Sequence, residues 1–482
     1  MPTDLAFLDA TAQAELVRRK EVTPRELVDA AISRIEAVNP QLNAVIAPLF
    51  DKARAQAEST TLANGPFRGV PFLLKDLGCH SAGDPYHQGM RFLRDLKWVA
   101  KNDTYMAAKL RAAGFIFVGK TNTPELAILP TTEPEAYGPT RNPWDTNRSP
   151  GGSSGGAAAA VASGMVPAAH ANDGGGSIRI PAGICGLVGL KPSRGRVSLG
   201  PDHGEMWQGM AIEHVVTRSV RDSAAILDAI AGPMPGDPYT APLPVRPFLQ
   251  EVGANPGKLR IGLMTRAPGG TMAVHPECVA ATQDAAKLLA SLGHTVEESY
   301  PTALDASHER ARHFWTILTT SIAAHLDAVE QQTGKTIGPQ DVELYTWTSR
   351  EIGRTRSGTR YVQALTWLQA HSRYIAAWWN DGFDLLLTPT IAELPPLLGQ
   401  FTATTENPLA PGRRSEALAS FTPAFNITGQ PGISLPLYWS AEGLPVGVHL
   451  VAAYGREDLL IRVASQLEQA RPWAGRRPPV HA

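Results

Sequence analysis

Short apolar runs alternate with longer amphipathic stretches along most of this 482-residue chain. Runs typical of buried strands lie at 43–50, 69–75, 115–118, 165–171, 259–264, 294–299, 385–387, 425–437 and 444–453. Helical periodicity predicts helices at 11–20, 24–39, 51–59, 104–113, 156–164, 219–231, 275–292, 303–333, 342–381 and 456–469. Strands that alternate with helices indicate an α/β fold, with a central mixed β-sheet covered by helices on both faces.

Local signals set the ends of several of these helices. Thr23 to Glu26 reads as a capping box with proline at the first helical position, and Asn39-Pro40 predicts the end of that helix. The proline- and glycine-rich stretch 233–256 is typical of a surface crossing, and the chain shows no internal repeat. We therefore predict a single domain over residues 1–482.

Composition and charge exclude several functional classes. The formal net charge is −1 with no basic run, which argues against a nucleic-acid partner. Cys79, Cys185 and Cys278 are widely spaced and odd in number, so they predict reduced thiols rather than disulfides or metal ligands. The first twenty residues lack the pattern of a signal peptide, and no apolar run is long enough for a membrane span. These features predict a cytoplasmic protein.

Candidate chemistry is concentrated in two glycine-rich serine sites. Ser153 and Ser154 lie in GGSSGG, and Ser177 follows the run Asp173-Gly174-Gly175-Gly176. A predicted helix and strand separate the two sites, so both can return to the same end of the sheet. Glycine N–H groups that a carbonyl can approach closely form oxyanion holes, and a serine after such a run is a candidate nucleophile.

A serine nucleophile needs a base, and Lys75 is the candidate. The run GVPFLLKD is apolar until it reaches Lys75, which predicts a lysine at the end of a buried strand. Burial lowers the pKa of a lysine and favours the neutral amine, which can accept a proton. A lysine in this position is more often a surface side chain that extends its charged end into water.

Two other motifs match better-known patterns but fail on context. Gly114 to Thr121 fits the phosphate-loop pattern, yet its middle residues, FIFV, read as the strand itself. Gly151 to Gly155 fits the nucleophile-elbow pattern of α/β-hydrolases, yet polar loop precedes it where a buried strand is needed. The group His308, Glu309 and His313 has the wrong spacing for a zinc helix, and His170 reads as a core histidine.

The combination of GGSSGG, DGGGS, IRIPAGICGLVGLKPS and the upstream GVPFLLKD resembles the amidase signature family. The resemblance implies a Ser–cisSer–Lys triad in which Ser177 is the acyl-forming nucleophile, Ser153 the bridging serine after a cis peptide, and Lys75 the base. It implies an oxyanion hole from the N–H groups of Gly174, Gly175, Gly176 and Ser177. We expect Asp173 and Arg179 to form a structural ion pair and Ser154 to hydrogen-bond within the site.

The resemblance covers the whole chain, with a signature core at about 65–235 and a cleft-shaping helical region at about 303–382. DATAQAELVR, NAVIAPLF, TTEPEAYGPTRNPW and VAAYGREDLL resemble a narrower group, the 6-aminohexanoate-cyclic-dimer hydrolases. Most tryptophans of the helical region are expected in the core, with one or two at a substrate cleft.

The resemblance implies an amidohydrolase for small linear or cyclic amides, with anilides, carbamates (a urethanase) or esters as alternative substrates. It implies no metal and no organic cofactor, and a homodimer is implied only at the level of the family. Two further alternatives stay open. One is the amidase subunit of a tRNA-dependent amidotransferase, which needs a protein partner; the other is a non-catalytic binding protein on the same fold.

Overall fold

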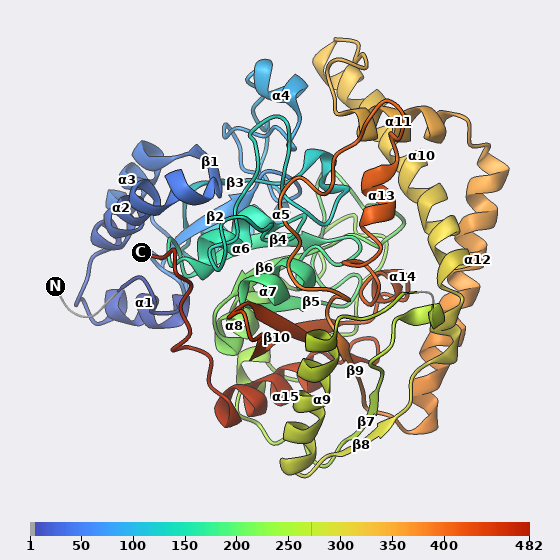
Figure 1. The fold of residues 1–482 in the computed structure, drawn as a ribbon. Helices are drawn as coiled ribbons and strands as arrows, with labels where there is room; N and C mark the ends of the chain where they lie inside the picture. The colour runs from blue at the N-terminus through green and yellow to red at the C-terminus, as the bar shows by residue number, and fades with distance from the viewer. Residues whose placement is uncertain (1–4, 271) are drawn as a thin grey trace.

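A computed structural model describes residues 5–270 and 272–482. Within these residues, eleven strands form one mixed sheet at the centre of the molecule (Figure 1). In order across the sheet they are β1 (Val45–Pro48), β3 (Ile116–Thr121), β2 (Pro71–Lys75), β4 (Ala168–Asp173), β6 (Ile212–Thr217), β5 (Val188–Lys191), β10 (Gly432–Trp439), β11 (Pro445–Ala452), β9 (Leu385–Pro389), β7 (Arg260–Leu263) and β8 (Thr295–Glu298). The predicted α/β architecture is confirmed.

The pairing of β2 decides where the candidate residues meet. β2 is parallel to both of its neighbours, β3 and β4, and Leu73 pairs with Ala169. β7 is likewise parallel to β8 and β9, whereas all other neighbouring strands are antiparallel. Because parallel neighbours end at the same edge, Lys75 at the end of β2 lies beside the end of β4.

Fifteen α-helices and five short 3-10 helices surround the sheet in the described part of the chain. The α-helices are α1 (Ala10–Arg18), α2 (Pro24–Leu42), α3 (Phe50–Glu58), α4 (Arg91–Asp95), α5 (Tyr105–Ala112), α6 (Gly155–Ala162), α7 (Arg179–Cys185), α8 (Val220–Ile230), α9 (Pro276–Ser291), α10 (Ser307–Thr333), α11 (Leu344–Arg354), α12 (Gly358–Ala377), α13 (Ala410–Arg414), α14 (Ala424–Ile427) and α15 (Glu457–Ala470). The 3-10 helices are η1 (Glu125–Ala127), η2 (Phe248–Glu251), η3 (Pro268–Gly270), η4 (Thr302–Asp305) and η5 (Trp378–Asp381).

Both faces of the sheet are covered by helices, because successive side chains of β2 point to opposite faces and all of them are apolar until Lys75. Phe72 and Leu74 belong to the core that includes residues of α5, α8, α9 and α15. Leu73 between them belongs to the core on the other face, with residues of α2, α6 and α7. All three side chains are fully buried, and each such burial stabilises the fold by about 1.5–3 kcal/mol.

Helices α10, α11 and α12 form a separate flank, drawn in yellow and orange on the right of Figure 1. Leu318, Ile322 and Leu326 of α10 pack in one apolar cluster with Met90 and Leu93 from the α4 segment. The predicted helical region is therefore present and lies against the loops around β2. None of the described helices combines the length and apolar character needed to cross a bilayer.

Local signals predicted helix beginnings better than helix ends. The capping box is present, because Thr23 accepts from the Glu26 N–H while the Glu26 carboxylate accepts from the Thr23 N–H. The predicted end at Asn39-Pro40 is wrong, since α2 continues to Leu42 with Pro40 inside it. The side chain of Asn39 accepts the N–H groups of Ala44 and Val45, which stabilises the chain just beyond this extended end.

Strand predictions failed where buried polar residues or short lengths obscured the pattern. β5 and β6 were not predicted; β6 reads Ile-Glu-His-Val-Val-Thr, and every one of these residues is buried. The start of the predicted strand 425–437 is wrong, because residues 424–427 form α14 and β10 begins only at Gly432. Likewise β4 begins at Ala168 rather than at Met165.

The close contact between α10 and α11 generates a stability prediction. A Cβ on Gly353 of α11 would lie 2.1 Å from the carbonyl oxygen of Thr319 on α10. We expect Gly353→Ala to lower the free energy of unfolding by about 1–3 kcal/mol through this overpacking, measured as a fall in Tm.

Gly358 at the start of α12 is the matched control, because a Cβ there meets nothing within 4 Å. Gly358→Ala should leave Tm unchanged or raise it slightly. Equal Tm values for the two variants would contradict the close packing of α10 on α11.

Candidate active site

The side chain of Lys75 is the centre of the candidate site. It is completely buried at the end of β2. Its Nζ lies 2.6 Å from Ser153 Oγ, 3.0 Å from Ser154 Oγ and 2.6 Å from Asn172 Oδ1. Lys75 is therefore in direct contact with Ser153 and Ser154, which lie 78 and 79 positions further along the chain, and with Asn172, which sequence analysis did not single out.

The hydrogen bonds around Lys75 have a defined direction. Asn172 Oδ1 can only accept, and the Ser154 hydroxyl donates to the carbonyl oxygen of Asn172, so both accept from the lysine. Burial lowers the pKa of the Lys75 ammonium to about 7, although the nearby carboxylates of Glu213 and Asp173 oppose this shift. A neutral amine has two N–H groups and one lone pair, so the lone pair is left for the hydroxyl of Ser153.

Glu213 of β6 organises the residues behind Lys75. Its carboxylate accepts from Asn172 Nδ2 at 3.3 Å, which fixes the amide with its oxygen toward the lysine. It also accepts from His170 Nε2, so the other ring nitrogen, Nδ1, accepts the backbone N–H of Lys75 at 3.3 Å. Burial lowers the pKa of His170, and the ring stays neutral in this position. His170 is the buried, satisfied histidine that was expected.

Sequence analysis missed Asn172 and Glu213. Asn172 directly precedes Asp173, so its place beside the glycine run was the one available signal. Glu213 lies on an unpredicted strand, 41 positions from Asn172, and no spacing pointed to it. Only the antiparallel pairing of β4 with β6, in which Asn172 lies opposite Glu213, brings the two together.

Ser153 and Ser154 lie just before α6, and the peptide bond between Gly152 and Ser153 is cis. Both serines are buried. Residues 116–121 of the phosphate-loop pattern form strand β3, which extends past the predicted strand at 115–118, and Lys120 is buried within it. Among the described residues, no cluster of His, Cys, Asp and Glu is arranged to hold a metal ion.

A fully buried ion pair holds the glycine-rich loop. Arg179 Nε donates to Asp173 Oδ2 at 2.9 Å, and Arg179 Nη2 donates to Asp173 Oδ1 at 2.9 Å. Asn426 Nδ2 donates to both the carboxylate and the backbone carbonyl of Asp173. Burial alone would raise the pKa of Asp173, but the charge of Arg179 outweighs it and holds the pKa well below its usual range. Asp173 and Arg179 thus form the predicted pair.

The same loop presents free backbone N–H groups. The N–H of Gly176 donates to Asp173 Oδ1 at 2.7 Å and is already engaged, which corrects the prediction of a four-amide oxyanion set. Gly174, Gly175 and Ser177 donate no backbone hydrogen bond to any residue that the structure describes. Gly176 has φ +141°, and a Cβ there would lie 2.4 Å from Thr422 Oγ1, so this turn needs glycine.

Ser177 is partly exposed at the junction of two cavities. The larger cavity, of about 690 Å³, also reaches Ser153 and Asn172. The smaller cavity, of about 460 Å³, contains neither of these and passes Gly175, Phe314 and Tyr345. Within the described residues the Ser177 hydroxyl makes no hydrogen bond, so its link to Ser153 is not formed in this state.

The chain matches a known family over most of its length. A sequence model of the family described as Amidase matches residues 26–461. The chain is 46% identical to 6-aminohexanoate-cyclic-dimer hydrolase of Paenarthrobacter ureafaciens over 478 residues, which are 98% of this chain and 96% of that protein.

Solved structures agree with this match. The structure of a 6-aminohexanoate cyclic dimer hydrolase complexed with substrate has a TM-score of 0.96 and 45% identity, and covers 100% of both chains. A bacterial aryl acylamidase of the amidase signature family has a TM-score of 0.87 and 28% identity, and covers 98% of this chain and 99% of its own.

The buried pair of Asp173 and Arg179 generates the prediction for this site. Arg179→Met leaves the Asp173 carboxylate buried without its cation, so we expect a loss of about 3–5 kcal/mol in the free energy of unfolding, measured by denaturant titration.

The exposed pair of Arg19 and Glu15 on α1 is the control. Arg19→Met should change the free energy of unfolding by less than about 1 kcal/mol. A similarly small effect of Arg179→Met would contradict the role of the pair in holding the glycine-rich loop.

Proposed function

The chain belongs to the amidase signature family and is an amidohydrolase, and from this premise we propose that it cleaves the C–N bond of small linear or cyclic amides through Ser177, Ser153 and Lys75. The observation that carries the proposal is the set of hydrogen bonds at Lys75. Two of the three partners of Nζ must accept, which leaves the amine lone pair directed at Ser153. Lys75 is the base in this proposal, Ser153 the relay and Ser177 the nucleophile.

Acylation begins with the transfer of two protons. Neutral Lys75 takes the proton of Ser153, which takes that of Ser177, while Ser177 Oγ bonds to the substrate carbonyl carbon. The carbonyl electrons move to its oxygen, which accepts from the free N–H groups of Gly174, Gly175 and Ser177. Substrate binding must first bring Ser177 into contact with Ser153, a tightening that free active sites commonly undergo.

The tetrahedral intermediate then collapses. The C–N bond breaks, the leaving nitrogen takes a proton from Ser153, and the Lys75 ammonium returns its proton to Ser153. Water attacks the acyl-enzyme by the same relay and releases the acid. The Asp173–Arg179 pair and Ser154 support this site without exchanging protons. The chemistry uses only side chains and backbone N–H groups of the chain, and the proposed partner is a small-molecule amide or carbamate.

The activities of similar proteins suggest the substrate class. The relatives named above are hydrolases of the 6-aminohexanoate cyclic dimer and an aryl acylamidase. We therefore place amides that resemble nylon oligomers first, and anilides, carbamates or esters second. The amidotransferase-subunit alternative requires glutamine as substrate and a partner protein.

A substrate panel tests the function directly. Purified protein is assayed with 6-aminohexanoate cyclic dimer, a nitroanilide, an aryl carbamate and glutamine. We expect wild type to hydrolyse at least one amide or carbamate alone, and Ser177→Ala to lower kcat/KM by more than about a thousandfold. Full activity in Ser177→Ala, or turnover of glutamine alone, would refute the proposal.

The pH profile tests the role of Lys75. The base must be neutral, so kcat/KM should rise with pH through about 7, the pKa to which burial brings Lys75. This rise on the acidic side of the profile is called the acid limb below. The carboxylates of Glu213 and Asp173 both favour the charged amine, whereas His170 is neutral. Glu213→Gln keeps the size of the side chain but removes its charge and one of its two acceptor oxygens, and the lost charge should move this rise in activity to lower pH by roughly one unit.

Asp228→Asn is the control for the pH profile. Asp228 is an exposed carboxylate that accepts the N–H groups of Phe248 and Leu249, away from the cavities. Its neutralisation should leave the acid limb in place. An unchanged limb in Glu213→Gln would show that the group that titrates is not Lys75.

A further inference from the structure

The two cavities at Ser177 are not equivalent with respect to the proton relay. Ser153 lines the larger cavity and is absent from the smaller one. In the proposed reaction, on which this inference rests, Ser153 gives its proton to the leaving nitrogen. That nitrogen and the atoms bonded to it must therefore lie in the larger cavity, and the acyl portion in the smaller one.

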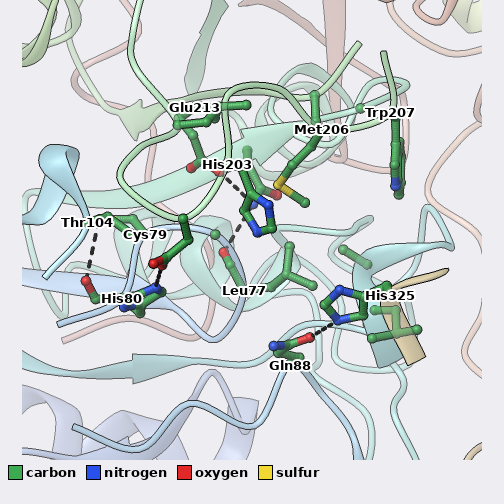
Figure 2. Close-up of a pocket in the computed structure, with 18 of the residues that line it drawn as sticks. Leu77, Cys79, His80, Gln88, Thr104, His203, Met206, Trp207, Glu213 and His325 are labelled. Carbon is green, nitrogen blue, oxygen red and sulfur yellow. Dashed lines mark hydrogen bonds and ion pairs between the residues drawn. The ribbon is translucent and has the colours of Figure 1, made fainter. Parts of the chain in front are cut away.

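The larger cavity is mostly apolar but contains three histidines, His80, His203 and His325 (Figure 2). Both ring nitrogens of His80 are occupied, because Nδ1 lies 2.9 Å from the carbonyl oxygen of Asn102 and Nε2 lies 2.6 Å from Asp202 Oδ2. Glu213 also lines this cavity, but its carboxylate is bound to His170 and Asn172. These groups are therefore not available to a ligand.

His325 of α10 has one nitrogen available. Its Nε2 lies 2.6 Å from Gln88 Oε1, and since an amide oxygen only accepts, Nε2 carries the proton. Nδ1 is then a free acceptor. Burial, with a smaller contribution from the neighbouring His203 in the same direction, lowers the pKa of His325 to about 4, so the ring is neutral near pH 7.

His203 is the complement of His325. It projects into the same cavity from the loop before β6, and its ring has no hydrogen-bond partner among the residues that the structure describes. His203 is exposed at the cavity, and partial desolvation by the surrounding residues lowers its pKa, so this ring too is neutral near pH 7. A neutral imidazole carries one N–H, so His203 can donate where His325 accepts.

We infer that His203 and His325 form a recognition pair for a second, uncharged amide or carbamate group in the leaving portion of the substrate. The substrate N–H donates to Nδ1 of His325, and the substrate carbonyl accepts the N–H of His203. A site built around a hydrogen-bonding group discriminates strongly against analogues without it, because its own polar atoms are then left unpaired. The preferred substrates are thus diamides and dicarbamates, including cyclic ones.

Three probes of similar size test this inference. N,N′-diacetyl-1,6-diaminohexane carries the second amide, an N-acetyl alkylamine of the same chain length carries none, and N-acetyl-1,6-diaminohexane carries a charged amine. The kcat/KM for release of the amine is measured by chromatography. We expect wild type to prefer the diamide over the alkyl probe by at least about tenfold, with the charged probe poorest.

Variants connect the preference to the two rings. His203→Leu and His325→Leu should each lower the diamide preference by about three- to tenfold, which is the effect of one hydrogen bond, with kcat/KM for the alkyl probe within twofold of wild type. His203→Asn, which keeps an N–H donor, should restore part of the preference. His313→Leu is the control, because His313 lies on the same helix but stacks on Trp367 outside both cavities.

The outcomes separate this inference from the proposed function. Equal, Ser177-dependent hydrolysis of the diamide and alkyl probes, or hydrolysis of neither while other amides are cleaved, overturns the recognition pair and leaves the amidohydrolase intact. Equal losses on both probes in the histidine variants also overturn it, since they indicate a structural role. Hydrolysis that does not depend on Ser177 refutes the proposed function itself.

Discussion

The candidate site depends on one constraint, the complete burial of a single lysine amine whose hydrogen bonds are all directional. An exposed lysine would be a solvated cation, whereas burial brings the pKa of Lys75 to about 7. Asn172 and the Ser154 hydroxyl can only accept from it, so the neutral amine directs its lone pair at Ser153. In the proposed relay, the direction of proton transfer follows from these two neighbours, which accept hydrogen bonds from the amine and donate none to it.

Layers of fixed contacts hold that geometry in place. Glu213 orients Asn172 and His170, and these contact the side chain and the backbone of Lys75. Another buried network, of Asp173, Arg179 and Asn426, holds the glycine-rich loop. The Asp173 carboxylate of this network accepts the N–H of Gly176, so that N–H is not free to bind a ligand. Asn426 lies 253 positions after Asp173, so the final third of the chain completes a site whose reactive groups lie in the first half.

Ser177 lies between two cavities that have different linings, so the site is asymmetric around this residue. Ser153, the relay residue of the proposed reaction, lines only one of them, so in that reaction the two halves of an amide meet different surroundings. Helix α10 contributes to both, with His325 in the larger cavity and Phe314 in the smaller. The close packing of α11 on α10 at Gly353 thereby helps to position walls of both cavities.

Sequence by itself determined the alternation of strands and helices, the place of Lys75 at a strand end and the two serine loops, because periodicity, caps and glycine runs are local properties. Only the tertiary structure placed Asn172 and Glu213 beside Lys75, and His203 and His325 in one cavity, since these arrangements come from pairings and cavities between distant segments. It also decided that Gly176 N–H is occupied and that β6 is a strand. Buried polar residues in β6 interrupt the apolar pattern, and only their partners across the sheet make such burial stable.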